Sequence, residues 1–443
     1  MKPGRSLALV ITLCLALVVV VLPLLGACAQ QPAAQPATPA AKPSEATAAA
    51  TPPEAKPAEA KPSEAKPAAP AGPAPASIKI GGVYSLTGAD SSVGAQVEAG
   101  YKLAIEAINK DGGVEVKGYG KKIPLELVAL DMESNAEKGI ARAEALYAQH
   151  KVTAYVGTTF FAAAVHVAEK NKVPAVVVAS AGQYVHERGY KYWFTPMGTS
   201  PDIARQVFDL LDSIPKAERP TKVVIFEEQS DWGIEMSEFW QKEIKNRGYN
   251  LTGIQKYTMM AKDLSPQILA AKSAGAELLL SNPIMPDGMT MMKQMKELAY
   301  KPKAAVVVRA PDDLPWGKAL GPLGDYVIFT SGWQHSMPFP GVPELNAAHQ
   351  VKFNRPADVM TGPAYASIQI IAEAIKKAGT LDTQKVRDAL ETTDMNTVVG
   401  PVKFRPDGTN AVPVAPVAQW QNGQQEVVWP DKLKTKPLVY PIP

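Results

Sequence analysis

Residues 78–88 read IKIGGVYSLTG, which is a short apolar run followed by a polar loop. Apolar residues then recur at helical spacing over residues 97–108, and the Asp-Gly-Gly sequence at 111–113 ends that pattern. A second apolar run follows at residues 123–130. The order strand, helix, strand predicts that the two strands lie parallel in one sheet.

The same alternation continues along the chain. Further strands are predicted at residues 152–156, 175–178, 222–226, 251–256, 278–281, 304–309 and 326–330. Further helices are predicted at residues 136–150, 162–172, 234–247, 264–274, 287–299, 364–377 and 383–391. Asn422-Gly423 predicts a type I′ hairpin between strands at 414–421 and 425–429. Continuous apolar strands predict parallel sheets covered on both faces, and the restart of the pattern after Pro220 predicts a second α/β unit.

The N-terminus carries a predicted export signal. Lys2 and Arg5 precede an apolar stretch at residues 7–25, which is long enough to raise the alternative of a membrane-spanning anchor. The stretch ends in LGAC at residues 25–28, which resembles the lipobox of bacterial lipoproteins. This resemblance implies that residues 1–27 are a signal peptide, and that Cys28 carries lipid after cleavage.

Residues 28–77 are predicted to form a disordered tether. They are rich in Ala and Pro, and the motif EAKP recurs at 54–57, 59–62 and 64–67. Because Pro removes helix donors and almost no large apolar side chain is present, this segment has little to bury. We expect a solvated spacer between Cys28 and the folded part of the chain.

The composition excludes several classes of protein. The 443 residues include 46 basic and 43 acidic ones, and a net charge of +3 is too small to indicate nucleic-acid binding. The two cysteines, Cys14 and Cys28, exclude a disulfide scaffold and a Cys-based zinc site. No P-loop, G-x-S-x-G or H-E-x-x-H motif occurs, and the five histidines never pair at helical spacing. We therefore expect no catalytic residue, no bound metal and no cofactor.

Small and polar residues stand at the carboxyl ends of the predicted strands, where open α/β sheets bind their ligands. Backbone N–H groups at the start of the following helices can hold a carboxylate. The same residue types also serve as simple helix caps, and that alternative stays open at each position. The positions are Ser85, Asp131, residues 158–160, residues 180–183, Glu227, Asn282 and Arg309.

Several motifs occur in a set order along the chain. They are IGGVYSLTG at 80–88, AIEAIN at 104–109, YVG at 155–157, Trp232-Gly233 and GPVKF at 400–404. Together they resemble the leucine/isoleucine/valine-binding protein family, the substrate-binding subunits of bacterial ABC importers. The resemblance covers nearly all of residues 78–443.

The resemblance implies a type I periplasmic-binding fold, in which two Rossmann-like lobes with parallel sheets close on a ligand. The first lobe would comprise residues 78–198 plus 331–398, and the second 199–330 plus 399–443. Three hinge crossings would fall near residues 196–199, 329–332 and 398–401.

The resemblance also implies a ligand site shared by both lobes. In the first lobe, the residues that would bind a ligand carboxylate are Thr158, Thr159 and Phe160, together with Ser180, Ala181, Gly182 and Gln183. The remaining contacts map onto Tyr84 and Ser85 in the first lobe and onto Trp232, Ile284 and Arg309 in the second.

Two positions depart from the family pattern. Gln183 stands where amino-acid binders often have Thr or Ser, and Arg309 stands where many have an acid that receives the ligand's ammonium group. A cation there would favour a ligand with a second anionic or neutral acceptor group, although Asp312 or Asp313 could be the acid instead. A branched-chain or other hydrophobic amino acid is the family default, and an aromatic or other organic acid is the rival ligand.

The resemblance finally implies the partners and the location of the protein. Permease and ATPase subunits would be encoded separately, and the lipid anchor would hold the protein at a membrane on the extracytoplasmic side. A ligand-binding subunit of a sensory system remains the alternative to transport, and we expect no enzyme activity.

Overall fold

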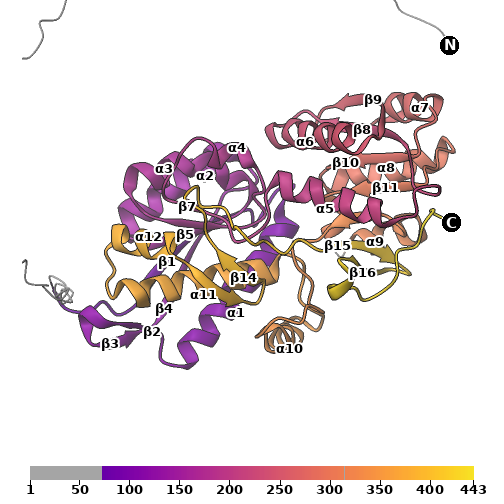
Figure 1. The fold of residues 1–443 in the computed structure, drawn as a ribbon. Helices are drawn as coiled ribbons and strands as arrows, with labels where there is room; N and C mark the ends of the chain where they lie inside the picture. The colour runs from indigo at the N-terminus through magenta and orange to yellow at the C-terminus, as the bar shows by residue number, and fades with distance from the viewer. Residues whose placement is uncertain (1–71, 314) are drawn as a thin grey trace, which may run out of the picture. The chain divides into compact units, whose positions relative to one another are not determined.

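The computed structural model describes residues 72–313 and 315–443. These residues form two main sheets and the helices that cover them (Figure 1). The predicted signal peptide, Cys28 and most of the predicted tether lie outside the described residues. Within residues 72–313 and 315–443, no helix has the length and apolar character needed to cross a bilayer.

The first sheet has five parallel strands in the order β4-β1-β5-β6-β7. Alternate side chains of each strand point to opposite faces, and both faces are buried. Ile80, Val156 and Val176 point to one core, and Val83, Tyr155 and Val177 point to the other. The strands are β1 (Ile78–Tyr84), β4 (Leu125–Asp131), β5 (Ala154–Gly157), β6 (Ala175–Val177) and β7 (Trp193–Phe194).

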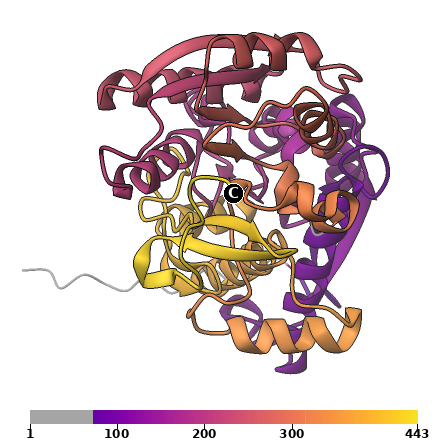
Figure 2. The same ribbon diagram turned by 90° about the vertical axis from the view of Figure 1, so that its right-hand side faces the viewer.

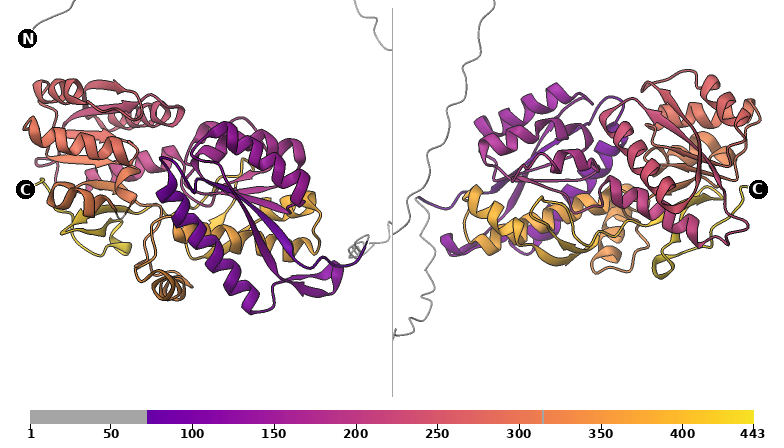
Figure 3. Two further views of the ribbon diagram at one scale, coloured as in Figure 1. Left: turned by 180° about the vertical axis from the view of Figure 1, so that it is seen from behind. Right: turned by 45° about the horizontal axis from the view of Figure 1, so that its top comes forward.

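Helices cover both faces of this sheet, as Figure 1 and Figure 3 show. One face carries α1 (Ser91–Lys110), α11 (Thr361–Ala378) and α12 (Thr383–Glu391). The other carries α2 (Ala136–Ala145), which continues as the π-helical turn Leu146–His150, the 3₁₀ helix Thr159–Ala164, α3 (Val165–Asn171) and α4 (Gln183–His186). A small hairpin of β2 (Val114–Val116) and β3 (Lys121–Ile123) follows α1.

The second sheet has seven strands in the order β16-β15-β12-β11-β10-β8-β9. The five strands from β8 to β12 are parallel, while β15 and β16 form an antiparallel hairpin at one side, shown in yellow in Figure 2. Asn422 and Gly423 both have positive φ, 52° and 73°, which confirms the predicted tight turn. The strands are β8 (Lys222–Glu228), β9 (Asn250–Tyr257), β10 (Leu278–Ser281), β11 (Ala304–Val307), β12 (Ile328–Thr330), β15 (Val417–Gln421) and β16 (Gln424–Trp429).

This sheet is also covered on both faces. The first face carries α5 (Ser200–Ser213) and α6 (Asp231–Arg247). The second face carries α7 (Ser265–Ser273), α8 (Met285–Glu297) and α9 (Pro315–Leu320). Met291, Met292 and Met295 of α8 are buried in that second core, as expected for a methionine stripe at helical spacing.

The chain passes between the two sheets three times. It leaves the first sheet after β7 and enters α5, and it returns after β12 to form α10 (Val342–Phe353), α11 and α12. The strands β13 (Asp394–Thr397) and β14 (Gly400–Lys403) then precede the hairpin. Val402 and Phe404 lie in the core of the first sheet, so β14 packs there, although the sequence analysis placed residues from 399 onward in the second lobe. The division into two moving lobes stays a prediction.

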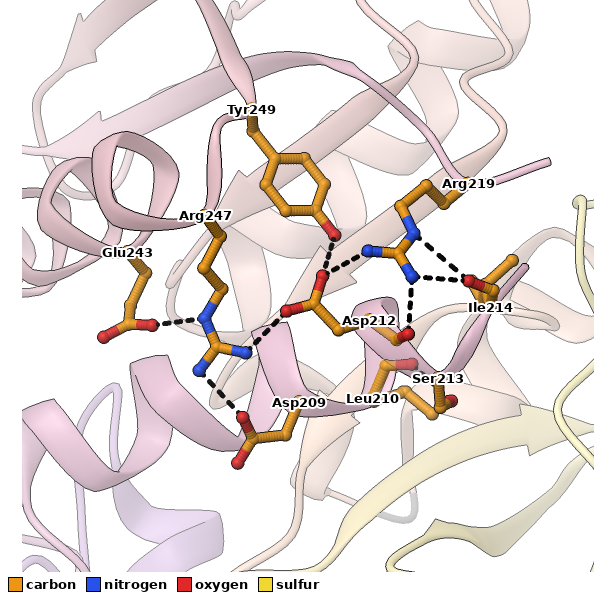
Figure 4. A network of polar contacts seen from close by, with 9 residues as sticks. All are labelled: Asp209, Leu210, Asp212, Ser213, Ile214, Arg219, Glu243, Arg247 and Tyr249. Carbon is orange, nitrogen blue, oxygen red and sulfur yellow. Dashed lines mark hydrogen bonds and ion pairs between the residues drawn. The ribbon is translucent and has the colours of Figure 1, made fainter. Parts of the chain in front are cut away.

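A network of polar contacts joins the ends of α5 and α6 (Figure 4). The Asp212 carboxylate accepts hydrogen bonds from Arg219 Nη1 at 2.6 Å, Arg247 Nη1 at 2.8 Å and the Tyr249 hydroxyl at 3.0 Å. Arg247 also donates to Asp209 and Glu243, both at 2.7 Å. The network fixes the loop between α5 and β8 against α6.

Candidate functional site

A cavity of about 920 Å³, counting its open mouth, is lined by residues from both sheets. Its walls are mostly apolar and include Val93, Met197, Ile203, Met360 and Val414. The polar groups come from the loops that follow β1, β6, β11 and β12. The cavity therefore lies at the carboxyl ends of strands, where ligands of such sheets bind. The polar lining residues are Asp90, Ser180, Tyr184, Arg309, Asp312, Thr330 and Ser331.

Arg309 supplies the positive charge of the cavity. Its guanidinium lies 3.6 Å from Asp90 Oδ1 and 4.0 Å from Glu228 Oε1, and its Cζ stands 5.9 Å from the centre of the Trp232 ring. Asp90 comes from the loop between β1 and α1, whereas Glu228 ends β8. Arg309 thus joins groups from both sheets, and two carboxylates balance its charge.

Arg309 also lines a second cavity that adjoins the first. This outer cavity shares Ala162, Tyr184, Trp232 and Arg309 with the inner one. Tyr184 and Trp232 therefore border both cavities.

Asp312 and Asp313, which the sequence left as alternative acids for the site, differ in position. Asp312 lines the cavity, whereas Asp313 turns toward α1 and accepts a hydrogen bond from Gln96 Nε2 at 2.6 Å. Burial raises the pKa of Asp312 well above its usual range, the neighbouring Asp313 raises it further, and Arg309 opposes both. Burial also raises the pKa of Asp90, and Arg309 again opposes it. Asp90 Oδ2 and Asp312 Oδ1 have no hydrogen-bond partner within the described residues, so both can receive a cationic group.

Three residues of the turn that follows β6, Ser180, Ala181 and Gly182, line the cavity. Gln183 is not among the lining residues, and its backbone N–H donates to Glu235 Oε2 at 3.1 Å. The chain's own carboxylate thus occupies a donor that the sequence analysis assigned to a ligand.

Among the other predicted site residues whose side chains the structure describes, Trp232 and Arg309 are the two at the cavity wall. Tyr84 is fully buried in the first core and contacts the Tyr101 ring at 5.7 Å. Ser85 and Thr158 are fully buried, and Ile284 is the N-cap residue of α8. Thr159 and Phe160 begin the 3₁₀ helix Thr159–Ala164, and the description excludes their side chains.

Several residues of the site were not predicted from the sequence. Asp90 is an N-cap residue before α1, Tyr184 directly follows a predicted site residue, and Thr330 ends a predicted strand, so each carried a weak signal. Glu235 occupies an ordinary polar position of a predicted helix, so the sequence carries no signal for its role. Its role arises only from contacts with residues far away in the sequence.

The chain is similar to known proteins over most of its length. A family model described as "Periplasmic binding protein" matches residues 77–425. Leu/Ile/Val-binding protein homolog 7 of Brucella suis biovar 1 (strain 1330) is 28% identical over 374 residues, which cover 80% of this chain and 92% of the relative.

Two solved structures share the fold. The substrate-binding protein LivJ from Streptococcus pneumoniae, in complex with isoleucine, has a TM-score of 0.70 at 20% identity and covers 79% of this chain and 98% of its own. A solute-binding protein of an ABC transporter from Rhodopseudomonas palustris, in complex with 3,4-dihydroxy benzoic acid, has a TM-score of 0.66 at 22% identity. That match covers 78% of this chain and 93% of the other.

Proposed function

The chain belongs to the periplasmic binding protein family, and on this premise we propose that it captures an amino acid for an ABC importer. The ligand is of the branched-chain or other hydrophobic type. The observation that carries the proposal is the cavity itself, which combines apolar walls with the acidic side chains of Asp90 and Asp312 and with the turn 180–182.

The charges around Arg309 support a ligand that has an ammonium group. Asp90 and Glu228 already balance the guanidinium, so Arg309 does not leave the cavity positive. Asp312 and the free oxygen of Asp90 are then the acceptors for the ammonium. Since a buried charge needs a partner, binding of the ammonium favours the ionised form of Asp312.

The ligand carboxylate is assigned to the turn 180–182, and the aliphatic side chain to the apolar wall around Met197, Met360 and Val414. Burial of an apolar side chain contributes about 1.5–3 kcal/mol, which is comparable to the charged contacts. An amphipathic ligand therefore uses both kinds of surface.

An organic acid without an amine is the second candidate. One observation favours it: Arg309 Nη2 is buried and makes no hydrogen bond within the described residues, since its nearest carboxylate, Asp90, stands 3.6 Å away. A second acidic or phenolic group on the ligand would fill that place. The Rhodopseudomonas palustris protein in complex with 3,4-dihydroxy benzoic acid is a family precedent for such a ligand.

Capture proceeds by closure of two lobes around the ligand. The ligand binds the closed form better and shifts the equilibrium toward it, and exclusion of water strengthens the charged contacts. The closed protein then docks on a permease that works with separate ATPase subunits. We place the protein outside the cytoplasm, held at a membrane by lipid on Cys28.

A thermal melt of the full chain tests the ligand class. The panel contains the twenty amino acids, aromatic carboxylates and dicarboxylates at about 1 mM. A ligand at about 100 times its dissociation constant stabilises the protein by about 2.7 kcal/mol, which raises the melting temperature clearly. A shift with Leu, Ile or Val supports the first candidate. A shift only with acids that lack an amine replaces it with the second, and catalytic turnover of any bound compound contradicts both.

Trp232 provides a test of the site. Trp232→Ala removes the ring that lines both cavities and faces Arg309, and we expect at least about tenfold weaker binding of the ligand found in the panel. Isothermal titration calorimetry measures the effect. Tyr147→Ala, an exposed ring outside both cavities, is the control. Equal affinity of the two variants would remove Trp232 from the site.

A further inference from the structure

Glu235 of α6 receives three hydrogen bonds from two other segments of the chain. Its Oε1 accepts from the backbone N–H of Tyr184 at 2.6 Å, and its Oε2 accepts from that of Gln183 at 3.1 Å. The hydroxyl of Ser200 also donates to Oε2. Both N–H groups belong to the first turn of α4, where a helix offers no internal acceptor.

These bonds connect structures that belong to different sheets. Tyr184 and Val185 of α4 pack in the core beside the first sheet. Met236 and Trp240, on the same helix as Glu235, pack in the core beside the second sheet. One carboxylate therefore holds α4 and α6 together across the division between the two sheets.

The same carboxylate also positions the cavity wall. Trp232 Nε1 donates to Ser200 Oγ at 3.1 Å, and Ser200 donates to the Ala181 carbonyl through its backbone N–H at 2.8 Å. Ala181 lines the inner cavity, and Tyr184 and Trp232 line both cavities. Glu235 is therefore linked to Tyr184 through its backbone N–H and to Trp232 through Ser200.

Two other charged groups face the opposite part. Gln96 Nε2 donates to Asp313 at 2.6 Å, and Arg309 stands 3.6 Å from Asp90. Hydrogen bonds to an ionised carboxylate are stronger than neutral ones. Glu235 accepts two backbone hydrogen bonds from the other part, from Gln183 and Tyr184, and a third from Ser200 in its own part.

We propose that Glu235 is a positioning residue that holds the closed form together by occupying the backbone N–H groups of Gln183 and Tyr184. The proposal rests on the proposed function, because it concerns closure over the same cavity. Glu235 sets how long the closed form lasts, and the ligand supplies the remaining stabilisation.

Hydrogen exchange of the ligand-free full chain tests the bond directly. In Glu235→Ala, the amides of Gln183 and Tyr184 lose their acceptors, and we expect them to exchange at least about tenfold faster than in the unchanged protein. Glu238→Ala is the matched control, because this substitution removes the same charge. Glu238 is exposed and lies one turn nearer the C-terminus of α6. Glu235→Gln keeps one accepting oxygen, so we expect its two amides to exchange at a rate between those of Glu235→Ala and the unchanged protein.

Dissociation of L-leucine tests the consequence for the cavity. We expect Glu235→Ala to raise the dissociation rate by about tenfold or more while the association rate stays within about threefold, because the variant loses closed-state contacts and keeps the ligand's own. Unchanged exchange of the two amides, or equal effects in Glu238→Ala, would overturn the proposal. If L-leucine fails to bind, the proposed ligand class is wrong, and the exchange of the two amides still decides the role of Glu235.

Discussion

Arg309 adopts a backbone conformation that few residues other than glycine adopt. Its φ and ψ are 81° and −66°, and the N–H of Ala310 donates to the carbonyl of Val308 at 3.2 Å across it. These values describe a classic γ-turn, which is rare and strained. The turn directs the guanidinium to the cavity, so the strain lies at the functional site.

The strain at Arg309 can be measured by a pair of variants. Arg309→Gly and Arg309→Ala both lose the guanidinium, but only glycine adopts positive φ without steric cost. We expect the Gly variant to be more stable than the Ala variant by about 1 kcal/mol in urea unfolding. Equal stability, or a more stable Ala variant, would show that the turn relaxes when the ion pairs are lost.

Asp313 makes the stability of the protein depend on pH. Burial raises its pKa from 3.8 to about 6, the hydrogen bonds from Ser92 and Gln96 oppose this, and the nearby Asp90 and Asp358 add to it. The folded state therefore binds the proton more tightly than the unfolded state. Stability is lost as pH rises from about 4 to 6.

Asp313→Asn should remove this loss, because the amide oxygen can still accept from Gln96. We expect the variant to be more stable than the unchanged protein by about 2–3 kcal/mol at pH 7, with the difference vanishing near pH 4. Urea unfolding at both pH values measures it. A difference that is the same at pH 4 and pH 7 would contradict the raised pKa.

At the level of single residues, several of the predicted ligand contacts lie at the cavity. Ser180–Gly182, Trp232 and Arg309 line it, whereas Ser85 and Thr158, which also follow strands, are fully buried. Strand ends and motif spacing are local properties, and they do not tell which strand end opens into the cavity.

Sequence reasoning could not find Glu235, since the partners of that carboxylate lie 35 to 52 residues away in the sequence. Nor could it decide between Asp312 and Asp313, because adjacent residues differ only in the direction that the folded loop gives them.

Among the elements, α5 is a helix that the sequence analysis did not predict, although the sequence carries two helix signals for it. Thr199 and Asp202 form a capping box at its start, and Val207, Leu210 and Leu211 are buried on one face. Both signals are local, and the predicted second unit simply began after Pro220. The type I′ hairpin was predicted correctly because Asn-Gly fixes its turn through backbone sterics alone.

The network around Asp212 should stabilise the junction of α5 and α6. Asp212→Ala removes acceptors from Arg219, Arg247 and Tyr249, and we expect a loss of about 1–2 kcal/mol in the free energy of unfolding. Asp209→Ala removes one ion pair with Arg247 and should cost about half as much or less. Equal losses in the two variants would mean that the contacts of Asp212 with Arg219 and Tyr249 add no measurable stability.

For the whole molecule, the fold class and the family predicted from the sequence are confirmed. Both rest on many weak signals that occur in a fixed order along the chain. The exact passages between the sheets were harder to predict. The strand β14 packs with the first sheet because Val402 and Phe404 fill its core, and a sequence does not reveal which of two cores an apolar side chain enters.

The predicted lipid anchor is tested on the intact chain in a bacterial host. Cys28→Ala removes the acceptor of the lipid, and we expect the protein to move from the membrane fraction to the soluble envelope fraction. Cell fractionation with immunodetection measures the distribution. Continued membrane attachment of the variant would contradict the lipoprotein prediction and favour an uncleaved hydrophobic anchor.

The interleaved path of the chain has a consequence for how the protein is made. In the second sheet β12 pairs with β15, and in the first part α1 packs against α11, but the chain between β12 and β15 first builds α10, α11 and α12. A chain that emerges from its N-terminus during synthesis and export therefore completes neither half until its last strands arrive. Until then β12 presents an unpaired edge, so the yield of the protein in a cell will depend on how well the unfinished chain is kept from aggregating.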